Sequence, residues 1–375
     1  MKVELKVSTG EFRGDGKEGV SESEYHVLIG VSEGGAPFGE QLEAVLVECK
    51  RITESLKARP IVRRYFVSDA ANQSDPVRLG DAGLVPCAVS IIQQPPANGS
   101  KVALWIYLLS EADVSLLAPD VLLAAHGGYR HLWVTSMTQP SGTALEQTGE
   151  LFRRYDDLLI AHGDVLALNC LRTWLFVRDV DLRYGAVVDA RTAFFNTHGL
   201  TKDTHYITST GIEGRTACTN SFVMMDALAV EGLKEEQIAF LHAPSYLNRT
   251  IDYGVTFERG TAVTYGDRRH IFISGTASIN DKGDVLYLGD VIRQAERTLQ
   301  NIDALLHSAG ASLDHIKQAI VYLRDTADYA AVEAFLAERM KNYLIVIAPV
   351  CRPAWLIEIE CIAITDAGDD RYPSL

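Results

Sequence analysis

The sequence predicts an α+β fold built from three similar modules, each ordered β-α-β-α-β-β. An amphipathic helix pattern occurs three times, a strand that ends in Asp follows each of these helices, and two further strands close each segment. Any α/β protein alternates helices and strands, but three matching helix stripes with the same strand ending indicate an internal repeat. Modules of this kind place their helices on one face of a mixed sheet.

The amphipathic helices carry the clearest repeat. In each of them the stripe residues are spaced 3, 4, 3 and 4 apart, which puts them on one face that can pack on a sheet. A short apolar strand precedes each helix. The stripes span Leu42–Leu56, Leu145–Leu159 and Ile292–Leu306, and the preceding strands are Val27–Val31, Leu132–Ser136 and Ile271–Gly275.

The later elements repeat with one exception. The Asp-terminated strands end at 65–69, 175–179 and 321–325. A second helix is predicted at 184–195 and 329–340, but only a polar loop at 72–83, so the first module is expected to be degenerate. Paired strands are predicted to close the modules at 87–94 with 102–109, at 206–212 with 222–230, and at 344–350 with 355–364.

The module boundaries are expected where the repeat pattern breaks. Linkers are predicted near 118–128 and at 232–260, and the residues after Asp366 form a polar tail. The chain is therefore divided into a degenerate first module (1–118), a second module (119–240), and a linker with the C-terminal module (241–375).

Composition excludes several classes of protein. The chain of 375 residues carries 35 Lys and Arg against 49 Asp and Glu, a net charge of −14, which argues against a nucleic-acid binder. No run approaches the roughly 18 apolar residues of a membrane span, and no signal peptide is visible, so a cytoplasmic protein is expected. The six cysteines are scattered and the histidines lack ligand spacing, so we predict no metal, and no glycine-rich motif indicates a nucleotide cofactor.

One carboxylate stands out when the final strands of the modules are compared. Glu360 aligns with Asp226 but Glu358 aligns with Met224, and the corresponding strand of the first module has no carboxylate. On an apolar strand that faces a cleft between modules, burial would raise the pKa of Glu358 toward the value that a general acid needs near neutral pH. The pattern alone equally allows an exposed glutamate that pairs with Lys or Arg.

Several long segments resemble the chorismatase family, and the last hundred residues resemble the wider RidA/YjgF superfamily. The superfamily resemblance is carried by Ile273–Gly275, Ala309–Ala311, Val321–Asp325 and Ile357–Ala363. Members typically form trimers with sites between subunits, so the resemblance implies three RidA/YjgF-like (chorismate-mutase-like) modules fused as a pseudo-trimer in one monomeric chain. The chorismatase segments are TWLFVRDVD at 173–181, HYITSTGIEGR at 205–215, YGVTFERG at 253–260, FISGTASI at 272–279 and VCRPAWLIEIEC at 350–361.

The resemblance implies an enzyme that releases pyruvate from chorismate, a small dianion, without a cofactor. Glu358 falls on the catalytic glutamate of chorismatases, which protonates the enol ether. Cys351, seven residues earlier, resembles the members that form 3-hydroxybenzoate, and Ala243 is expected to fill space that a glycine would leave open. The alternative product is a dihydroxycyclohexadiene carboxylate formed by hydrolysis. Cys351 could equally be a small buried hydrophobe.

The two carboxylates of such a substrate call for arginine forks. Arg215, at the end of the Ser-Thr-Gly-Ile-Glu-Gly-Arg turn, and Arg324, at the end of a third-module strand, are the candidates, while Arg259 and Arg352 could be surface ion pairs. Tyr206 could hydrogen-bond the substrate or belong to the core. Gly275 could give the substrate close access to the backbone or simply end a strand.

Two other functions remain open. The first is the enamine or imine deamination that is common in RidA proteins; its substrate-binding arginine, counted back without gaps, falls on Tyr343, although a gap would bring Arg352 to that place. The second is a binding protein for small molecules that has lost catalysis. Met224, which stands in the second module where the third has Glu358, shows that a module can lose the acid.

Overall fold

The structure, a computed structural model, describes residues 3–14 and 23–375. Its elements fall into three consecutive groups. The first contains β1 (Leu5–Arg13), β2 (Ser23–Val31), α1 (Phe38–Leu56), β3 (Arg59–Val67), α2 (Ala70–Asp81), β4 (Ala88–Gln93) and β5 (Val102–Leu109). The second contains β6 (Asp113–Ala118), β7 (Val121–His126), β8 (Tyr129–Thr138), α3 (Ala144–His162), α4 (Leu166–Asn169), β9 (Cys170–Val177), α5 (Val180–Thr197), β10 (Thr208–Glu213) and β11 (Val223–Glu231). The third contains β12 (Ile238–Phe240), β13 (Gly260–Thr264), β14 (Arg269–Ala277), α6 (Val291–Ser308), β15 (Ile316–Leu323), α7 (Tyr329–Ala337), β16 (Tyr343–Ile347) and β17 (Ile357–Thr365).

The strands of the described residues form three sheets with the same central order. The four-strand core β2-β5-β3-β4 of the first sheet recurs as β8-β11-β9-β10 in the second and β14-β17-β15-β16 in the third. Extra strands extend one edge of each core: β1 in the first sheet, β7 and β6 in the second, and β13 and β12 in the third. This recurrence confirms the predicted α+β architecture of three fused modules.

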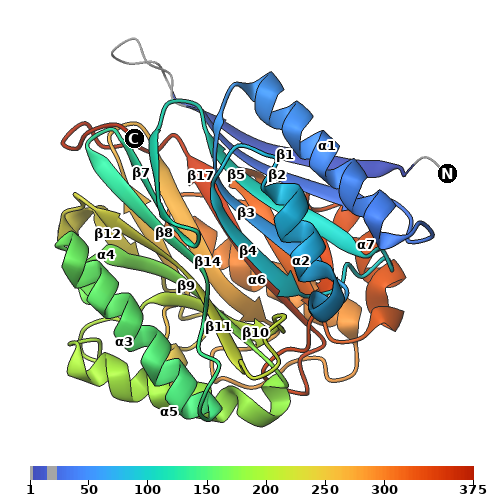
Figure 1. The fold of residues 1–375 in the computed structure, drawn as a ribbon. Coiled ribbons are helices and arrows are strands. Elements are labelled where there is room, and N and C mark those ends of the chain that lie inside the picture. The colour runs from blue at the N-terminus through green and yellow to red at the C-terminus, as the bar shows by residue number, and fades with distance from the viewer. Residues whose placement is uncertain (1–2, 15–22) are drawn as a thin grey trace.

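The four-strand core of each sheet is buried on both faces. The outer face packs under helices, as in the first module, where Leu42, Val45, Cys49 and Ile52 of α1 lie in a core with the sheet. The inner faces of the three sheets meet in a shared core that includes Trp105, Trp174 and residues of β14 and β17. The helices therefore lie on the outside and the strands face the centre (Figure 1).

The prediction of a polar loop at 72–83 is wrong, because the first module keeps its second helix, α2. The Asp69 side chain caps α2 by accepting a hydrogen bond from the Asn72 backbone N–H (3.4 Å). Pro76 inside the helix opposes it by propensity, but packing of one face overrides that preference. That face is mostly small or polar, so it left no hydrophobic periodicity to read. Its buried residues are Ala70, Gln73, Ser74, Val77 and Asp81.

Two further expectations need correction. The two closing strands of a module are not neighbours: β4 runs parallel to β3, while β5 lies between β2 and β3 and is antiparallel to both. The helix between β3 and β4 is a crossover connection, which makes these strands parallel. The linker predicted near 118–128 is instead a hairpin, β6 and β7, on the edge of the second sheet. The boundaries at 118 and 240 stay predictions, although β6 and β12 precede them and pair with the sheet that follows.

A buried ion pair crosses each interface between modules. Each pair joins two different modules, and the participating side chains are at most 5% exposed. Charges in such surroundings are tolerated because each finds an opposite charge and further hydrogen bonds. The pairs are Arg64 with Asp226 (2.8 Å), Arg172 with Glu360 (2.7 Å), and Arg268 (2.6 Å) and His270 (2.7 Å) with Glu24.

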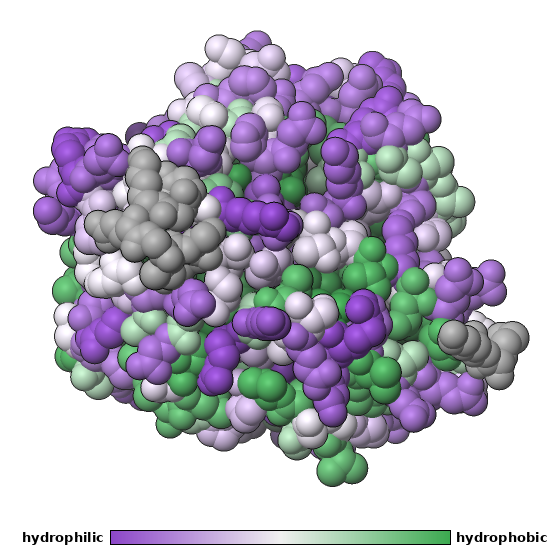
Figure 2. Space-filling view, turned by 90° about the horizontal axis from the view of Figure 1, so that it is seen from above, coloured by the Kyte–Doolittle hydropathy of each residue, from purple (hydrophilic) through white to green (hydrophobic). Residues whose placement is uncertain are grey.

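The surface is that of a globular protein with mixed polarity. The face seen in Figure 2 intersperses hydrophobic and hydrophilic residues, and hydrophilic ones predominate in its upper half. Among the helices of the described residues, we find none with the length and apolar character that crossing a membrane requires.

We predict that Asp226→Asn destabilises the protein by about 3–5 kcal/mol, because it leaves the Arg64 guanidinium buried without its counter-charge. Chemical denaturation monitored by circular dichroism measures the change. The control is Glu150→Gln, which breaks an exposed pair with Arg153 and should cost less than about 1 kcal/mol. Equal effects of the two substitutions would contradict the importance of the buried interface pair.

Candidate functional site

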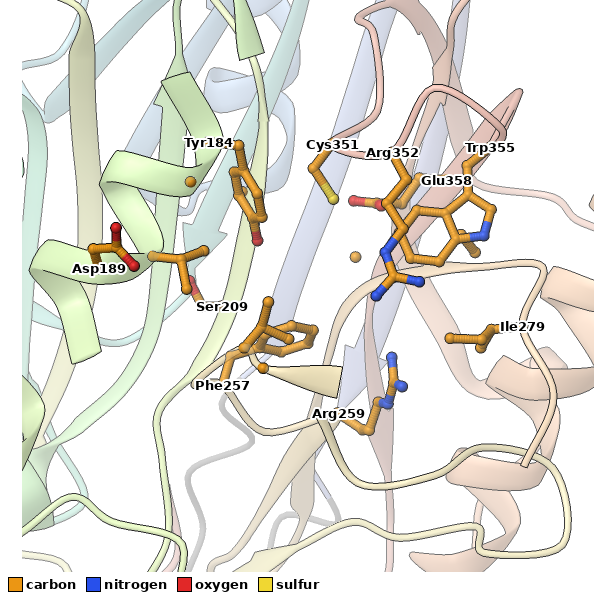
Figure 3. A pocket seen from close by; sticks show the side chains of 17 residues that line it. Tyr184, Asp189, Ser209, Phe257, Arg259, Ile279, Cys351, Arg352, Trp355 and Glu358 are labelled. Carbon is orange, nitrogen blue, oxygen red and sulfur yellow. The ribbon is translucent and has the colours of Figure 1, made fainter. Parts of the chain in front are cut away.

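A cavity of about 360 Å³ lies between the second and third modules (Figure 3). Tyr184 of α5 stands on one side, and Cys351 and Glu358 face it from the other. Arg259 and Arg352 enter from the segments that precede β13 and β17. The volume falls within the range of small-molecule sites, and the wall combines apolar surface with a few polar and charged groups.

Strand β17 brings Glu358 to the cavity. In the third sheet Glu358 lies opposite Ala277 of β14 and Tyr322 of β15, so its strand is central and its backbone is fixed on both sides. Because side chains alternate along a strand, Glu358 and Glu360 point to the same face, which meets the second module. Glu358 is 4% exposed.

Gly275 makes room for the Glu358 carboxyl group. The register between β14 and β17 shifts between Ile273 and Thr276, which places an extra residue in β14 at this point. A Cβ atom on Gly275 would lie 2.1 Å from Oε1 of Glu358, a distance that atoms do not tolerate. The Gly275 backbone N–H donates to Thr210 Oγ1 of β10 (2.9 Å), which fixes the bulge against the second module. Gly275 thus lines the cavity.

The surroundings of Glu358 favour its protonated form. Burial and the nearby negative charge of Glu360 raise the pKa of Glu358 to about 8, while Arg259 and Arg172 act in the opposite direction. A carboxylic acid with such a pKa carries a proton at neutral pH and can deliver it to a bound molecule. The exposed glutamate that the pattern also allowed is therefore not what the structure shows.

The Cys351 thiol faces the same space. It is packed against the cores of both the second and the third module. Burial, followed by the charge of Glu358, raises its pKa above the ordinary value, although Arg352 and a hydrogen bond with Tyr184 lower it. A thiol in this state is a poor nucleophile.

Two arginines that the sequence left as possible surface pairs lie at the cavity. Arg259 is 5% exposed and donates to the Asn248 carbonyl oxygen from Nη2 (3.3 Å). Arg352 lies over the Trp355 ring, 4.8 Å from its centroid. Together they make this end of the cavity positively charged, which suits an anion. Arg259 lies at the end of a long irregular segment before β13. Such a segment has no hydrophobic periodicity, so the sequence could not predict that Arg259 reaches the cavity.

The structure places the other predicted binding residues elsewhere. Arg215 donates to Asp179 Oδ1 (2.7 Å) beside a separate surface hollow, and Arg324 forks onto Asp181 (2.9 and 3.0 Å) and also reaches the Val350 carbonyl. The predicted clamp of Arg215 and Arg324 is therefore not assembled at this cavity, because both side chains are drawn to carboxylates at the start of α5.

Tyr206 and Ala243 do not line the cavity either. Tyr206 is buried and lines a different hollow, next to β12, and its backbone N–H donates to Glu258 Oε1 (2.9 Å). Ala243 belongs to the shared core, where its carbonyl accepts from the N–H groups of Tyr246 and Leu247 (2.8 Å each). Neither contact could be read from residue type alone.

A second cavity, of about 230 Å³, occupies the related position between the third and first modules. Tyr343 and Ile345 of β16 line it at the register positions that Ser209 and Gly211 hold in β10. The position of Glu358 is taken in the first module by Ala103, which pairs with Gly30. This interface therefore keeps a hollow without the acid.

Among the residues that the structure describes, no group of three or more His, Cys, Asp or Glu side chains is arranged to hold a metal ion.

Sequence comparison identifies the C-terminal module. Residues 260–365 match the model of the family described as Endoribonuclease L-PSP. The 3-aminoacrylate deaminase RutC of Acinetobacter baylyi is 34% identical over 98 residues, which cover 25% of this chain and 77% of the relative. A RutC family protein of Pyrococcus abyssi is 35% identical over 68 residues, 18% of this chain and 54% of that protein. The chain therefore belongs to the RidA/YjgF superfamily, whose family model this is.

Structural comparison covers most of the chain. A crystal structure of chorismatase aligns with a TM-score of 0.65 at 17% identity, over 91% of this chain and 98% of the other. The protein thus has the fold of chorismatase, with all three modules matched in one chain.

We predict that Glu358→Gln stabilises the protein as pH rises. The folded pKa lies above the unfolded one, so the wild-type protein holds its full stability below about pH 4.5 and loses it progressively as pH rises toward 8. The glutamine amide of the variant does not ionise, so the stability of the variant does not fall for this reason as pH rises. At pH 8 the free energy of unfolding of the variant should exceed that of the wild type by roughly a few kcal/mol, and at pH 5 the two values should differ little. A difference that does not change with pH, measured by denaturant titration, would refute the raised pKa.

Proposed function

We propose that the protein is a chorismatase that cleaves chorismate to pyruvate and 3-hydroxybenzoate. The observation that carries this proposal is Glu358, a buried carboxylic acid with a pKa of about 8 at a cavity with two arginines. Cleavage of an enol ether begins with protonation of its methylene carbon, and an acid that keeps its proton at neutral pH is suited to that step. The fold shared with chorismatase over almost the whole chain supports the assignment.

In the proposed complex the substrate lies between the two modules. Arg259 and Arg352 bind its carboxylates, in place of Arg215 and Arg324, because their guanidinium groups enter the cavity. Glu358 donates its proton to the methylene group, and positive charge develops on the adjoining ether carbon. The partly buried, largely apolar wall limits the access of water to that centre.

The proposed product follows from the balance of atoms. Formation of pyruvate and 3-hydroxybenzoate consumes no water. The ring's own hydroxyl oxygen bonds to the ring carbon that carries the ether, the bond from that carbon to the ether oxygen breaks to release pyruvate, and opening of the resulting epoxide with loss of a ring proton makes the ring aromatic. Formation of the dihydroxycyclohexadiene carboxylate instead consumes one water. Cys351 supports the first outcome, because its side chain fills space near Glu358 with a group that binds water weakly. The hydrolytic product is the alternative if water reaches the protonated substrate.

A second function is deamination of a small imine or enamine acid. Arg352 lies at the cavity together with Glu358, the arrangement that a gap in the alignment allowed, and a relative of the C-terminal module bears the name 3-aminoacrylate deaminase. Incubation with chorismate and, separately, with an enzymatically generated 2-imino acid distinguishes the two activities by release of pyruvate or of ammonia. Binding of chorismate without turnover would indicate the non-catalytic function.

We predict that the wild-type protein releases pyruvate from chorismate and that Glu358→Gln lowers kcat by about 10²–10⁴-fold, the usual contribution of a general acid. Coupled oxidation of a reduced nicotinamide by lactate dehydrogenase measures pyruvate. Glu333→Gln, at the second cavity, is the matched control and should turn over normally. Normal turnover by Glu358→Gln would show that the proton comes from another group.

We predict that Cys351→Ala still releases pyruvate but shifts the aromatic product toward the dihydroxycyclohexadiene carboxylate, because the smaller side chain admits water. Liquid chromatography of the reaction mixture gives the product ratio. Cys361→Ala, on β17 but in the core, is the control and should leave the ratio unchanged. An unchanged ratio in Cys351→Ala would leave this cysteine a packing role.

A further inference from the structure

Strand β17 presents a second buried acid to the interface that holds the cavity. The Glu360 carboxylate accepts hydrogen bonds from Arg172 Nη2 (2.7 Å) and from Trp174 Nε1 (2.8 Å), both on β9 of the second module. The side chains of Glu360 and Arg172 are 3% and 2% exposed. This pair therefore holds the Glu360 carboxyl group against a cation two residues from Glu358, on the same face of the strand.

The pair is also connected to the wall of the cavity. Arg172 Nη2 donates to Thr210 Oγ1 (2.5 Å), and the same oxygen accepts from the Gly275 backbone N–H (2.9 Å). Gly275 is the residue whose missing side chain makes room for the Glu358 carboxyl group. A single hydroxyl group thus links the interface ion pair to the backbone that contacts Glu358.

We infer that Glu360 is a positioning residue whose charge, fixed by Arg172, keeps Glu358 in the protonated form that donates the proton. Two neighbouring carboxylates in a region of low polarity do not ionise together readily, and the one with more donors takes the charge. Glu360 has the guanidinium and the indole N–H, so Glu358 retains the proton. The inference rests on the proposed general-acid role of Glu358.

The other charges around Glu358 determine the direction of the effect. Burial is the largest cause that raises the pKa of Glu358, and the charge of Glu360 adds to it, whereas Arg259, before β13, and Arg172, on β9, both lower it. Removal of the Glu360 charge therefore leaves two cations that favour ionised Glu358. Among the residues that line the cavity or lie opposite Glu358, the remaining titratable ones are Tyr184 and Asp189 of α5, Tyr322 of β15, and Cys351 and Arg352 before β17.

The test is the pH dependence of kcat/KM with chorismate for Glu360→Gln. In the wild type the rate should fall above about pH 8, where Glu358 loses its proton. In Glu360→Gln this alkaline limb should move to lower pH by about one unit or more. Glu360→Asp, which keeps the charge, should restore the wild-type limb.

Asp226→Asn is the matched control. It removes the acid of the pair with Arg64, a buried pair at the interface of the first and second modules, at the position that aligns with Glu360. It should cost comparable stability and leave the alkaline limb in place, because Met224 stands where the third module has Glu358. An unmoved limb in Glu360→Gln, or an equal shift in Asp226→Asn, would overturn the inference.

A second measurement does not need turnover. A protonated carboxylic acid has an infrared C=O band. The band that is present in the wild type and absent in Glu358→Gln reports the proton on Glu358 directly. In the wild type this band should disappear near pH 8. Disappearance near pH 5 would overturn the inference even if Glu360→Gln does not fold. A failure of the proposed function gives a different result: the band still titrates near pH 8, but the protein does not cleave chorismate.

Discussion

The site depends on a carboxyl group that is buried without becoming ionised. Glu358 lies on a central strand, where its backbone cannot move away, and beside Glu360, whose charge is fixed by Arg172. Two neighbouring features accommodate this arrangement: a bulge and a glycine in β14 provide space, and a strand of another module provides the cation. The cost of keeping an acid in such a place is offset by the packing of three modules around a common core.

The three interfaces share one construction but differ in their use. Each has a buried ion pair, and the acids Asp226 and Glu360 occupy aligned positions on β11 and β17. In the first module the aligned residue is Trp105, which stacks with Arg64 instead of pairing as an acid. The ion pairs are thus a structural device that the modules have in common, whereas the acid at the position of Glu358 belongs to one interface.

Sequence patterns predicted the elements that have a hydrophobic periodicity, but not the contacts between residues that are distant in sequence. The helix stripes and the Asp-terminated strands gave the module order, and alignment of the final strands found Glu358. The helix at Ala70–Asp81 was missed because its buried face is small and polar, so it carries no hydrophobic period. Arg259 was passed over in favour of Arg215, because a motif shows which residues are close in sequence but not that Asp179 already engages the guanidinium.

Fusion of the modules has a consequence for how the protein behaves at low concentration. A trimer of separate chains assembles its interfacial sites by mass action and loses them on dilution. Here the linking segments hold the second and third modules at a high effective concentration, whatever the amount of protein present. Activity per molecule should therefore be the same in a dilute assay and in a crowded cell, and the interface can carry a buried acid that a reversible contact would expose to water at each dissociation.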